Sequence, residues 1–378
     1  MKLNSRRGFL INTTLTGLGL LAGGSVNATF DRTIRSSPKR KIGVALLGLG
    51  GFATDSVAPE IASSKHVWLA GVITGDPDGK GKQWAAKYGF PEENIYHYDQ
   101  ISQIKNNPDI DFVHVVTPNG LHAKHTIAVA RAGKHVLCEK PMAVNSAECR
   151  KMITECRNAG ILLGIDYRLH WEPHHLKMVE LIQNRTYGAL KSIVTDFSWL
   201  RKDAKPWLLD FGLAGGGAFI DTGIYSVQAG CYLTGRVPLR VTAVPGSTRD
   251  VYQSGIEETM TVVFEFPDGV VMSSRASYAY DNHLCGVSSE NGTFSCEGSA
   301  FAQSVFGKPS PKHLKLPRGE SFRAENTLQI ATIYDAFAES ILYRKPFATT
   351  GEMGLRDTLV VEAVYRSAAS GKTENIII

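Results

Sequence analysis

The pattern of apolar positions changes near residue 166 and predicts two different sheets. Before that point, short apolar runs rich in β-branched residues alternate with stretches whose apolar positions recur at helical spacing. The expected strands are 42–47, 67–74, 112–116, 135–138 and 161–165, and the expected helices are 53–63, 81–88, 121–132 and 146–159. Such alternation is typical of a doubly wound parallel sheet. We therefore expect an α/β Rossmann domain that binds a dinucleotide over residues 41–165.

The remaining residues, 166–378, show consecutive strand-like runs joined by short turns such as Pro267-Asp268-Gly269. Strands are expected at 190–199, 240–244, 258–266, 270–276 and 293–297, and helices at 173–183, 217–233 and 325–342. Residues 301–322 contain several prolines and are expected to form a long surface loop. The pattern predicts an α+β substrate-binding domain with a predominantly antiparallel open sheet.

The first residues carry the pattern of an export signal. Arg6 and Arg7 precede a mildly apolar run over 10–24, which ends near a small-residue site at 26–28. Paired arginines in this context are typical of a twin-arginine signal peptide. A membrane anchor is the alternative, but polar residues interrupt the run and a span needs roughly 20 mostly apolar residues. We predict a signal peptide over 1–28, a linker over 29–40, transport by the twin-arginine export machinery and a periplasmic location.

The charge and the cysteines exclude several classes of protein. Part of the formal net charge of +5 lies in residues 1–28, which contain Lys2, Arg6 and Arg7 and no acid. The rest of the chain is nearly balanced, which argues against a nucleic-acid partner. The six cysteines match neither a disulfide scaffold nor a zinc site, so we expect buried free thiols and no metal.

A glycine-rich turn follows the first expected strand and opens the first expected helix. Gly48, Gly50 and Ala53 give the G-x-G-x-x-A form of the dinucleotide fingerprint, with Gly51 and Phe52 between them. Gly48 would allow the tight turn, Gly50 a close approach of the pyrophosphate, and Ala53 close packing of helix on strand. The amides at the helix start would face the phosphates. These residues are predicted to bind the cofactor.

The choice between NADP and NAD depends on the end of the second expected strand, where an acid would bind the ribose 2′-hydroxyl. That position is Thr74, followed by Gly75 and then by Lys80 and Lys82. A hydroxyl and two ammonium groups suit a 2′-phosphate, so we favour NADP. NAD stays open, because a shift of two residues would make Asp76 the ribose-binding acid.

Lys140 follows the strand expected at 135–138, in the sequence Glu139-Lys140-Pro141. Ligands of open α/β sheets bind beyond the carboxyl ends of the strands. A lysine there can donate to a substrate oxygen and stabilise the negative charge that develops during hydride transfer. Pro141 would set the direction of the chain, with a cis bond before it as one possibility. We predict that Lys140 is catalytic.

Three motifs together resemble one family. They are Pro118-Asn119 with His122, the run Ala132-Gly133-Lys134-His135 leading to Glu139-Lys140-Pro141, and Gly215-Gly216-Gly217 leading to Asp221 and Tyr225. They are similar to motifs of the glucose–fructose oxidoreductase, inositol dehydrogenase and MocA family, and the resemblance covers nearly the whole chain after the signal. It implies that Pro118, Asn119, His122, Glu139 and Lys140 contribute to cofactor binding.

Asp221 and Tyr225 are four residues apart on an expected helix, so they share one face. We predict both to be catalytic and to contact substrate, with Tyr225 as a general acid and base whose pKa the Lys140 ammonium lowers toward working pH. Many family members have histidine at the tyrosine position. The tyrosine at this position is similar to that of the periplasmic glucose–fructose and aldose–aldose oxidoreductases.

Other substrate contacts are expected near the junction of the two domains. Arg168 and His170 could donate to sugar hydroxyls, and Trp199 and Trp207 could offer an apolar face to a pyranose ring. An exposed apolar sheet face would favour a homo-oligomer.

The expected function is that of a sugar oxidoreductase. An exported enzyme has no pool of free nicotinamide nucleotide, so we expect tightly bound NADP and a ping-pong cycle. One aldose is oxidised at C1 to a lactone, and a second sugar is then reduced in the same pocket. The alternatives are an NAD-dependent redox-assisted glycosidase and a conventional NAD(P)-dependent sugar dehydrogenase. A non-catalytic sensor is disfavoured by the presence of Lys140, Asp221 and Tyr225 together.

Overall fold

A computed structural model describes residues 40–252, 255–297, 313–324 and 328–378. The expected signal peptide, the linker as far as residue 39 and the first half of the expected loop at 301–322 lie outside the described residues. The described chain enters at Arg40, whose side chain donates to Asp111 and to the Pro108 carbonyl oxygen. No helix in the described part of the chain combines the length and apolar character needed to cross a membrane.

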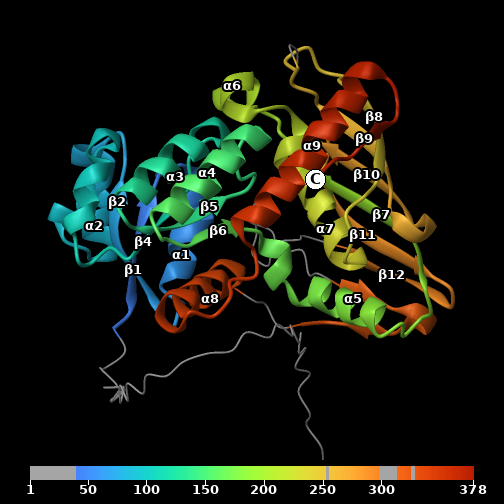
Figure 1. Ribbon diagram of the computed structural model, residues 1–378, viewed down its shortest axis with the longest axis horizontal. Helices are drawn as coiled ribbons and strands as arrows, with labels where there is room; N and C mark the ends of the chain where they lie inside the picture. Colours follow the sequence, from blue (N-terminus) through green and yellow to red (C-terminus); the bar gives the residue numbers. More distant parts are fainter. Residues whose placement is uncertain (1–39, 253–254, 298–312, 325–327) are drawn as a thin grey trace, which may run out of the picture. The chain divides into compact units, whose positions relative to one another are not determined.

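The N-terminal sheet has six parallel strands in the order β3-β2-β1-β4-β5-β6 (Figure 1). Their bounds are β1 Ile42–Leu47, β2 Val67–Ile73, β3 Ile95–Tyr96, β4 Phe112–Val115, β5 His135–Glu139 and β6 Leu163–Asp166. The strand order reverses between β1 and β4, which creates the switch point where such sheets bind ligands. The predicted Rossmann fold is confirmed, with β3 as an additional two-residue edge strand.

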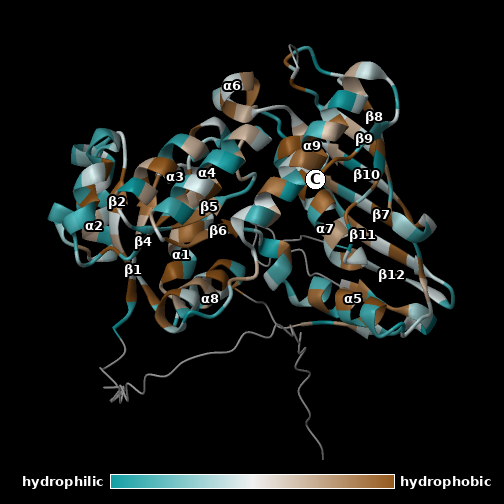
Figure 2. Cartoon of the chain, viewed as in Figure 1, coloured by the Kyte–Doolittle hydropathy of each residue, from teal (hydrophilic) through white to brown (hydrophobic). Residues whose placement is uncertain are grey.

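Helices pack on both faces of this sheet. They are η1 Ala53–Val57 continuing into α1 Ala58–Ile61, α2 Lys82–Tyr88, α3 His122–Arg131, α4 Ser146–Asn158 and, from much later in the chain, α8 Gln329–Tyr343. In α8, the rings of Tyr334 and Phe337 lie 5.8 and 5.2 Å from the Phe112 ring of β4. Figure 2 shows hydrophobic residues along α8, in agreement with its buried face.

The C-terminal sheet has nine strands in the order β14-β13-β12-β11-β7-β10-β9-β8-β15. Their bounds are β7 Leu190–Ser198, β8 Arg240–Gly246, β9 Thr259–Glu265, β10 Val271–Ser277, β11 Asn282–Ser289, β12 Gly292–Glu297, β13 His313–Lys315, β14 Ser321–Phe322 and β15 Glu374–Asn375. All neighbouring pairs are antiparallel except β7 with β10. The predicted, predominantly antiparallel sheet is confirmed.

Three helices pack on one another and on this sheet: α5 Pro173–Gln183, α7 Ile224–Thr234 and α9 Gly351–Ser370. Side chains along the strands alternate between buried and exposed, as in a sheet with one covered face. On the exposed positions, Val194, Val263 and Val271 keep about two fifths of their surface open to solvent. The open face of the sheet therefore carries exposed apolar residues, and self-association through it stays a prediction.

The expectation of a loop over residues 301–322 is wrong for its second half. Residues 313–315 and 321–322 form β13 and β14, joined by a turn in which Arg318 has a φ of 64°. Strands this short contain too few positions to show a period of two. All six cysteines are buried, as predicted, and Cys138, Cys149, Cys156 and Cys231 are free thiols.

Candidate active site

The turn between β1 and η1 has the geometry of a dinucleotide cradle. Gly48 has a φ of 97°, and a Cβ there would lie 2.8 Å from the Val116 carbonyl oxygen, so only glycine fits. A Cβ on Gly50 would meet nothing within 4 Å, which leaves open space above the turn. Ala53 is fully buried at the helix start. The residues present therefore suit a bound pyrophosphate.

The end of β2 carries the residues on which the choice between NADP and NAD depends. Thr74 is buried, and both carboxylate oxygens of Asp76 accept hydrogen bonds from backbone amides, those of Gly79 at 3.0 Å and Lys80 at 2.9 Å. Asp76 is thus occupied as the cap of η2 Pro77–Gly81. The Lys80 ammonium donates to the Leu49 carbonyl oxygen, so it lies beside the glycine turn.

Lys140, Asp221 and Tyr225 come together as the sequence predicted. The Lys140 Nζ donates to the Asp221 carbonyl oxygen at 2.6 Å and to Asp221 Oδ1 at 3.0 Å. The same Nζ lies 4.9 Å from the centre of the Tyr225 ring. Asp221 lies in η8 Phe219–Gly223, Tyr225 lies in the first turn of α7, and the Lys140–Pro141 bond is cis. The Lys140 ammonium and the Tyr225 ring therefore lie beside each other, although one follows a strand of the first sheet and the other lies on a helix packed on the second.

The charges of this site are set by its ion pairs. Burial would raise the pKa of Asp221, but Lys140 and Arg201 outweigh burial and hold that pKa at about 2. Burial would likewise lower the pKa of Lys140, yet the Asp221 carboxylate leaves it raised. Lys140 is thus an ammonium and Asp221 a carboxylate across the physiological range.

The expectation that Lys140 lowers the pKa of Tyr225 is wrong in its net result. Burial raises the pKa of the Tyr225 phenol to about 12, and the nearby ammonium only partly opposes this effect. The ring is enclosed by Phe197 and Trp199, whose centres lie 5.9 and 5.8 Å from its own. Tyr225 therefore stays protonated at neutral pH and is suited to donate a proton.

Sequence reasoning missed two side chains that hold Asp221. Arg201 Nη2 lies 3.3 Å from Asp221 Oδ2, and the Tyr278 hydroxyl donates to the same oxygen at 3.0 Å. Arg201 follows β7 and Tyr278 follows β10, which run parallel as neighbours. Neither residue stands in a motif, so only the pairing of these strands could have revealed them.

Glu257 was also missed. Its buried carboxylate accepts from the amides of Gly217 at 3.0 Å and Phe219 at 2.7 Å, and from the Tyr365 hydroxyl at 3.1 Å. Glu257 thus anchors the chain at the start of η8, which carries Asp221.

A second polar cluster lies at the ends of β4, β5 and β6. His114 Nε2 is 3.5 Å from Glu139 Oε1 and 3.6 Å from Asp166 Oδ2, and these three groups are close enough to share a cation. Burial lowers the pKa of His114 to about 4 and raises that of Asp166 to about 8, with Glu139 adding to the latter. At neutral pH the cluster thus holds a neutral His114 and a protonated Asp166 beside Glu139. Sequence reasoning did not find this cluster, because each residue comes from a different strand.

The polar side chains of the turn after Pro118 contact backbone carbonyl oxygens. Asn119 Nδ2 donates to the Ala214 carbonyl oxygen at 2.8 Å. His122 lies 2.8 Å from the Pro141 carbonyl oxygen and 2.7 Å from that of Thr117, and burial lowers its pKa to about 4. Both side chains therefore fix the backbone around the site. Pro118 precedes η5 Asn119–Leu121.

The predicted sugar contacts divide into two groups. Arg168 is buried and close enough to Tyr225 and Glu139 to influence their pKa values. The His170 ring instead lies against Tyr232, 3.9 Å between centres, and burial lowers its pKa to about 4. Trp207 is half-buried in η7 Pro206–Leu209. His170 is thus packed as a structural residue.

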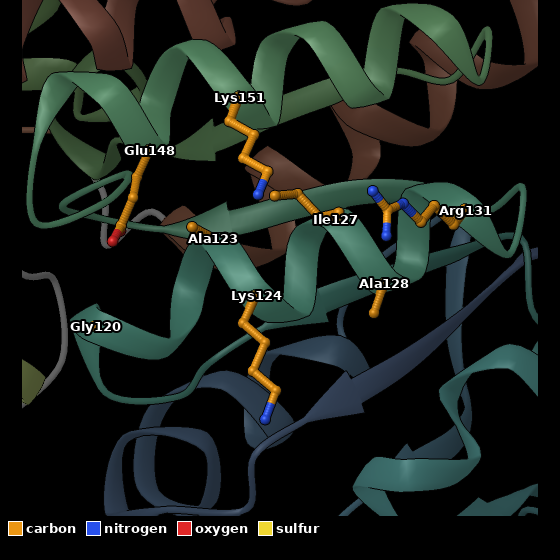
Figure 3. A pocket seen from close by; sticks show the side chains of 8 residues that line it. All are labelled: Gly120, Ala123, Lys124, Ile127, Ala128, Arg131, Glu148 and Lys151. Carbon is orange, nitrogen blue, oxygen red and sulfur yellow. The ribbon is translucent and has the colours of Figure 1, made fainter.

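A hollow of about 460 Å³ lies between α3 and α4 (Figure 3). It is lined by Gly120, Ala123, Lys124, Ile127, Ala128, Arg131, Glu148 and Lys151. None of these is a predicted site residue, so this hollow is separate from the Lys140 site.

Comparison with known proteins agrees with this geometry. Residues 42–167 match the model of an oxidoreductase family with an NAD-binding Rossmann fold, and residues 175–295 match the GFO/IDH/MocA C-terminal domain. The crystal structure of an aldose–aldose oxidoreductase from Caulobacter crescentus, complexed with glycerol, is similar with a TM-score of 0.83 and 36% identity, over 89% of this chain and 100% of that one.

Two curated relatives show more distant similarity. The 1,5-anhydro-D-fructose reductase of Ensifer adhaerens is 27% identical over 281 residues, which is 73% of this chain and 83% of that protein. The D-xylose 1-dehydrogenase (NADP(+)) 2 of Haloferax volcanii is 30% identical over 234 residues, 62% of this chain and 68% of that protein.

Proposed function

Because this chain belongs to the GFO/IDH/MocA family of oxidoreductases, we propose that it is a sugar oxidoreductase that keeps NADP tightly bound. It oxidises one aldose at C1 to a lactone and then reduces a second sugar in the same pocket. The similarity to an aldose–aldose oxidoreductase along nearly the whole described chain supports this substrate class.

The observation that carries the proposal is the buried Lys140–Asp221 pair beside the Tyr225 ring. A bound nicotinamide supplies the hydride acceptor and donor. Lys140, held as an ammonium by Asp221, faces the sugar oxygen and stabilises the negative charge on it, which develops when the hydroxyl proton leaves in oxidation and when hydride reaches the carbonyl carbon in reduction.

Tyr225 completes the proton transfer. In the reductive half-reaction its protonated phenol donates to the oxygen of the second sugar while Lys140 stabilises the resulting phenolate. In the oxidative half-reaction the Tyr225 phenolate left by the reductive half-reaction receives the hydroxyl proton of the first sugar. The two half-reactions together release no net proton.

NADP is favoured over NAD by the residues around the ribose position. The Lys80 ammonium lies at the glycine turn, and the carboxylate of Asp76 is occupied by backbone amides. The NADP(+)-dependent D-xylose 1-dehydrogenase among the relatives also supports this choice.

Export and cofactor retention belong to the same proposal. Arg6 and Arg7 mark a twin-arginine signal, which directs an already folded protein to the periplasm. A folded protein can carry its nucleotide with it. Retention then allows repeated turnover where no free nucleotide is present.

The test is to denature the purified protein and measure the nucleotide that is released. We expect close to one NADP per chain, and reduction of this enclosed nicotinamide when an aldose alone is added. Protein that is empty and needs added nucleotide for every turnover would refute the retained-cofactor cycle.

That negative outcome would favour a conventional sugar dehydrogenase, which the D-xylose 1-dehydrogenase relative supports. A redox-assisted glycosidase would instead hydrolyse nitrophenyl glycosides without net redox change.

A further inference from the structure

Lys205 approaches the glycine turn from a distant part of the chain. A Cβ built on Gly51 would lie 3.3 Å from the Lys205 Nζ. Lys80 reaches the same turn at the Leu49 carbonyl oxygen. Two ammonium groups, one from the nucleotide-binding part of the chain and one from the segment after β7, therefore flank one loop.

Two groups of opposite charge, the Lys205 ammonium and the Asp55 carboxylate, lie near Gly51. Asp55 Oδ2 is 3.6 Å from the same Cβ position of Gly51, in the first turn of the helix that the glycine turn opens. The negative charge of this carboxylate would repel a bound phosphate, and the positive charge of the Lys205 ammonium compensates for that repulsion. Lys205 is exposed and has no ion-pair partner among the described residues.

The backbone that presents Lys205 is docked on the nucleotide-binding part. Lys205 is the N-cap of η7, whose Leu208 is buried in the core. The chain then continues to Ala214, whose carbonyl oxygen accepts from Asn119, and to Gly212, whose carbonyl oxygen would be 2.1 Å from a Cβ on Gly120. These contacts hold the segment after Lys205 against the loop that follows β4.

We propose that Lys205 binds the pyrophosphate of the nicotinamide dinucleotide and slows its release. The glycine turn offers backbone amides from one side, and the lysine closes the other side with a charge-assisted hydrogen bond. This inference rests on the proposed function only in assuming a bound dinucleotide.

The experiment compares Lys205→Ala with Lys202→Ala, an exposed lysine on the same segment. Nucleotide-loaded protein is separated from free nucleotide, and release is followed by nicotinamide fluorescence at low and high salt. We expect release from Lys205→Ala to be about tenfold faster or more at low salt, the effect of one charge-assisted hydrogen bond. Lys202→Ala should release at the wild-type rate, and Lys205→Arg should restore slow release.

Added salt should bring the wild type toward Lys205→Ala, because it screens the exposed ammonium. Asp55→Asn should slow release, since it removes the opposing charge. Equal release from Lys205→Ala and wild type would overturn the inference while leaving retention intact.

If the wild type retains no nucleotide, the proposed function fails and the inference is still tested. The dissociation constant for added NADP is then measured in the same variants. Weaker binding confined to Lys205→Ala supports the inference, and equal constants overturn it.

Discussion

Lys140 is a buried cation whose charge is compensated by a single carboxylate. Asp221 is shared between Lys140 at 3.0 Å and Arg201 at 3.3 Å, so the three groups together carry one positive charge. Removing one member of a buried pair is costly, because it leaves a charge without its partner. This excess of positive charge suits a site in which negative charge develops on a sugar oxygen.

The substitution Lys140→Met should therefore abolish most activity without releasing the nucleotide. We expect the rate of hydride transfer to fall by about 10²–10³, as when an electrostatic donor to an oxyanion is lost. Single-turnover reduction of the bound nicotinamide measures this rate. Lys151→Met, on the exposed surface of α4, is the matched control. Wild-type rates in Lys140→Met would remove Lys140 from the mechanism.

Tyr225→Phe isolates the proton-transfer role. Loss of the phenol should lower the rate of the reductive half-reaction by about 10²–10⁴, the range for general acid catalysis, with nucleotide content unchanged. In the wild type, a pKa of about 12 means that Tyr225 contributes no loss of this rate between neutral and mildly alkaline pH. The variant Tyr232→Phe on the same helix serves as control. A Tyr225-dependent loss of rate near neutral pH would contradict this assignment.

Asp166 makes stability depend on pH. Its folded pKa of about 8 lies above its ordinary value of 3.8, so the folded state binds the proton more tightly than the unfolded chain. This contribution is complete below about pH 4 and is lost as pH rises through about 8. Asp166→Asn has no such proton to lose.

The unfolding free energy of Asp166→Asn should therefore rise relative to wild type between about pH 5 and pH 8. Urea unfolding at several pH values measures the difference, with the exposed Asp203→Asn as control. A difference that does not change over this range would show that Asp166 is ionised in the folded protein.

At the scale of elements, the short η8 segment must be placed accurately, because it positions Asp221 in the site. It carries Asp221, and its start is anchored by Glu257 through two amides and the Tyr365 hydroxyl. A buried donor that loses its acceptor costs about 1–3 kcal/mol. The placement of Asp221 therefore depends on a residue that does not touch the site.

Glu257→Ala should lower the unfolding free energy by about 3 kcal/mol and reduce hydride transfer, because several buried donors lose their acceptor together. Thermal unfolding and single-turnover kinetics measure the two effects. Glu320→Ala, at an exposed glutamate, should change neither. Normal turnover in a destabilised Glu257→Ala would show that η8 keeps its position without the anchor.

The elements that could be predicted are those with strong patterns. The strands β1, β2, β4, β5 and β6 are apolar runs buried on both faces, so composition alone reveals them. β11 was not predicted, because small and polar residues and Gly286 hide its alternation. α9 was missed because Gly351, Gly354 and charged residues dilute its apolar face.

The site was predictable only where a motif carries it. The glycine turn, Lys140, Asp221 and Tyr225 lie in recognisable runs, and the structure brings the last three together. Arg201, Tyr278 and the His114–Asp166 pair come from strands distant in sequence. Their meeting depends on strand order, which local patterns do not contain.

At the scale of the whole molecule, the proposed function requires a site built from both sheets and a nucleotide that stays bound there. The first sheet supplies the glycine turn and Lys140, and the segment before α7 supplies Asp221. In the proposed function, such a shared site holds its nucleotide from two sides. Self-association through the open sheet face, with its exposed Val194, Val263 and Val271, stays a prediction, as does the periplasmic location.

The most direct measurement follows one hydride through the protein. Purified protein is mixed with an aldose deuterated at C1, washed free of sugar and then given a second sugar, with no nucleotide added at any step. We expect deuterium in the reduced second sugar at close to one atom per chain. Loss of the label on washing, or transfer only when NADP is supplied, would contradict it.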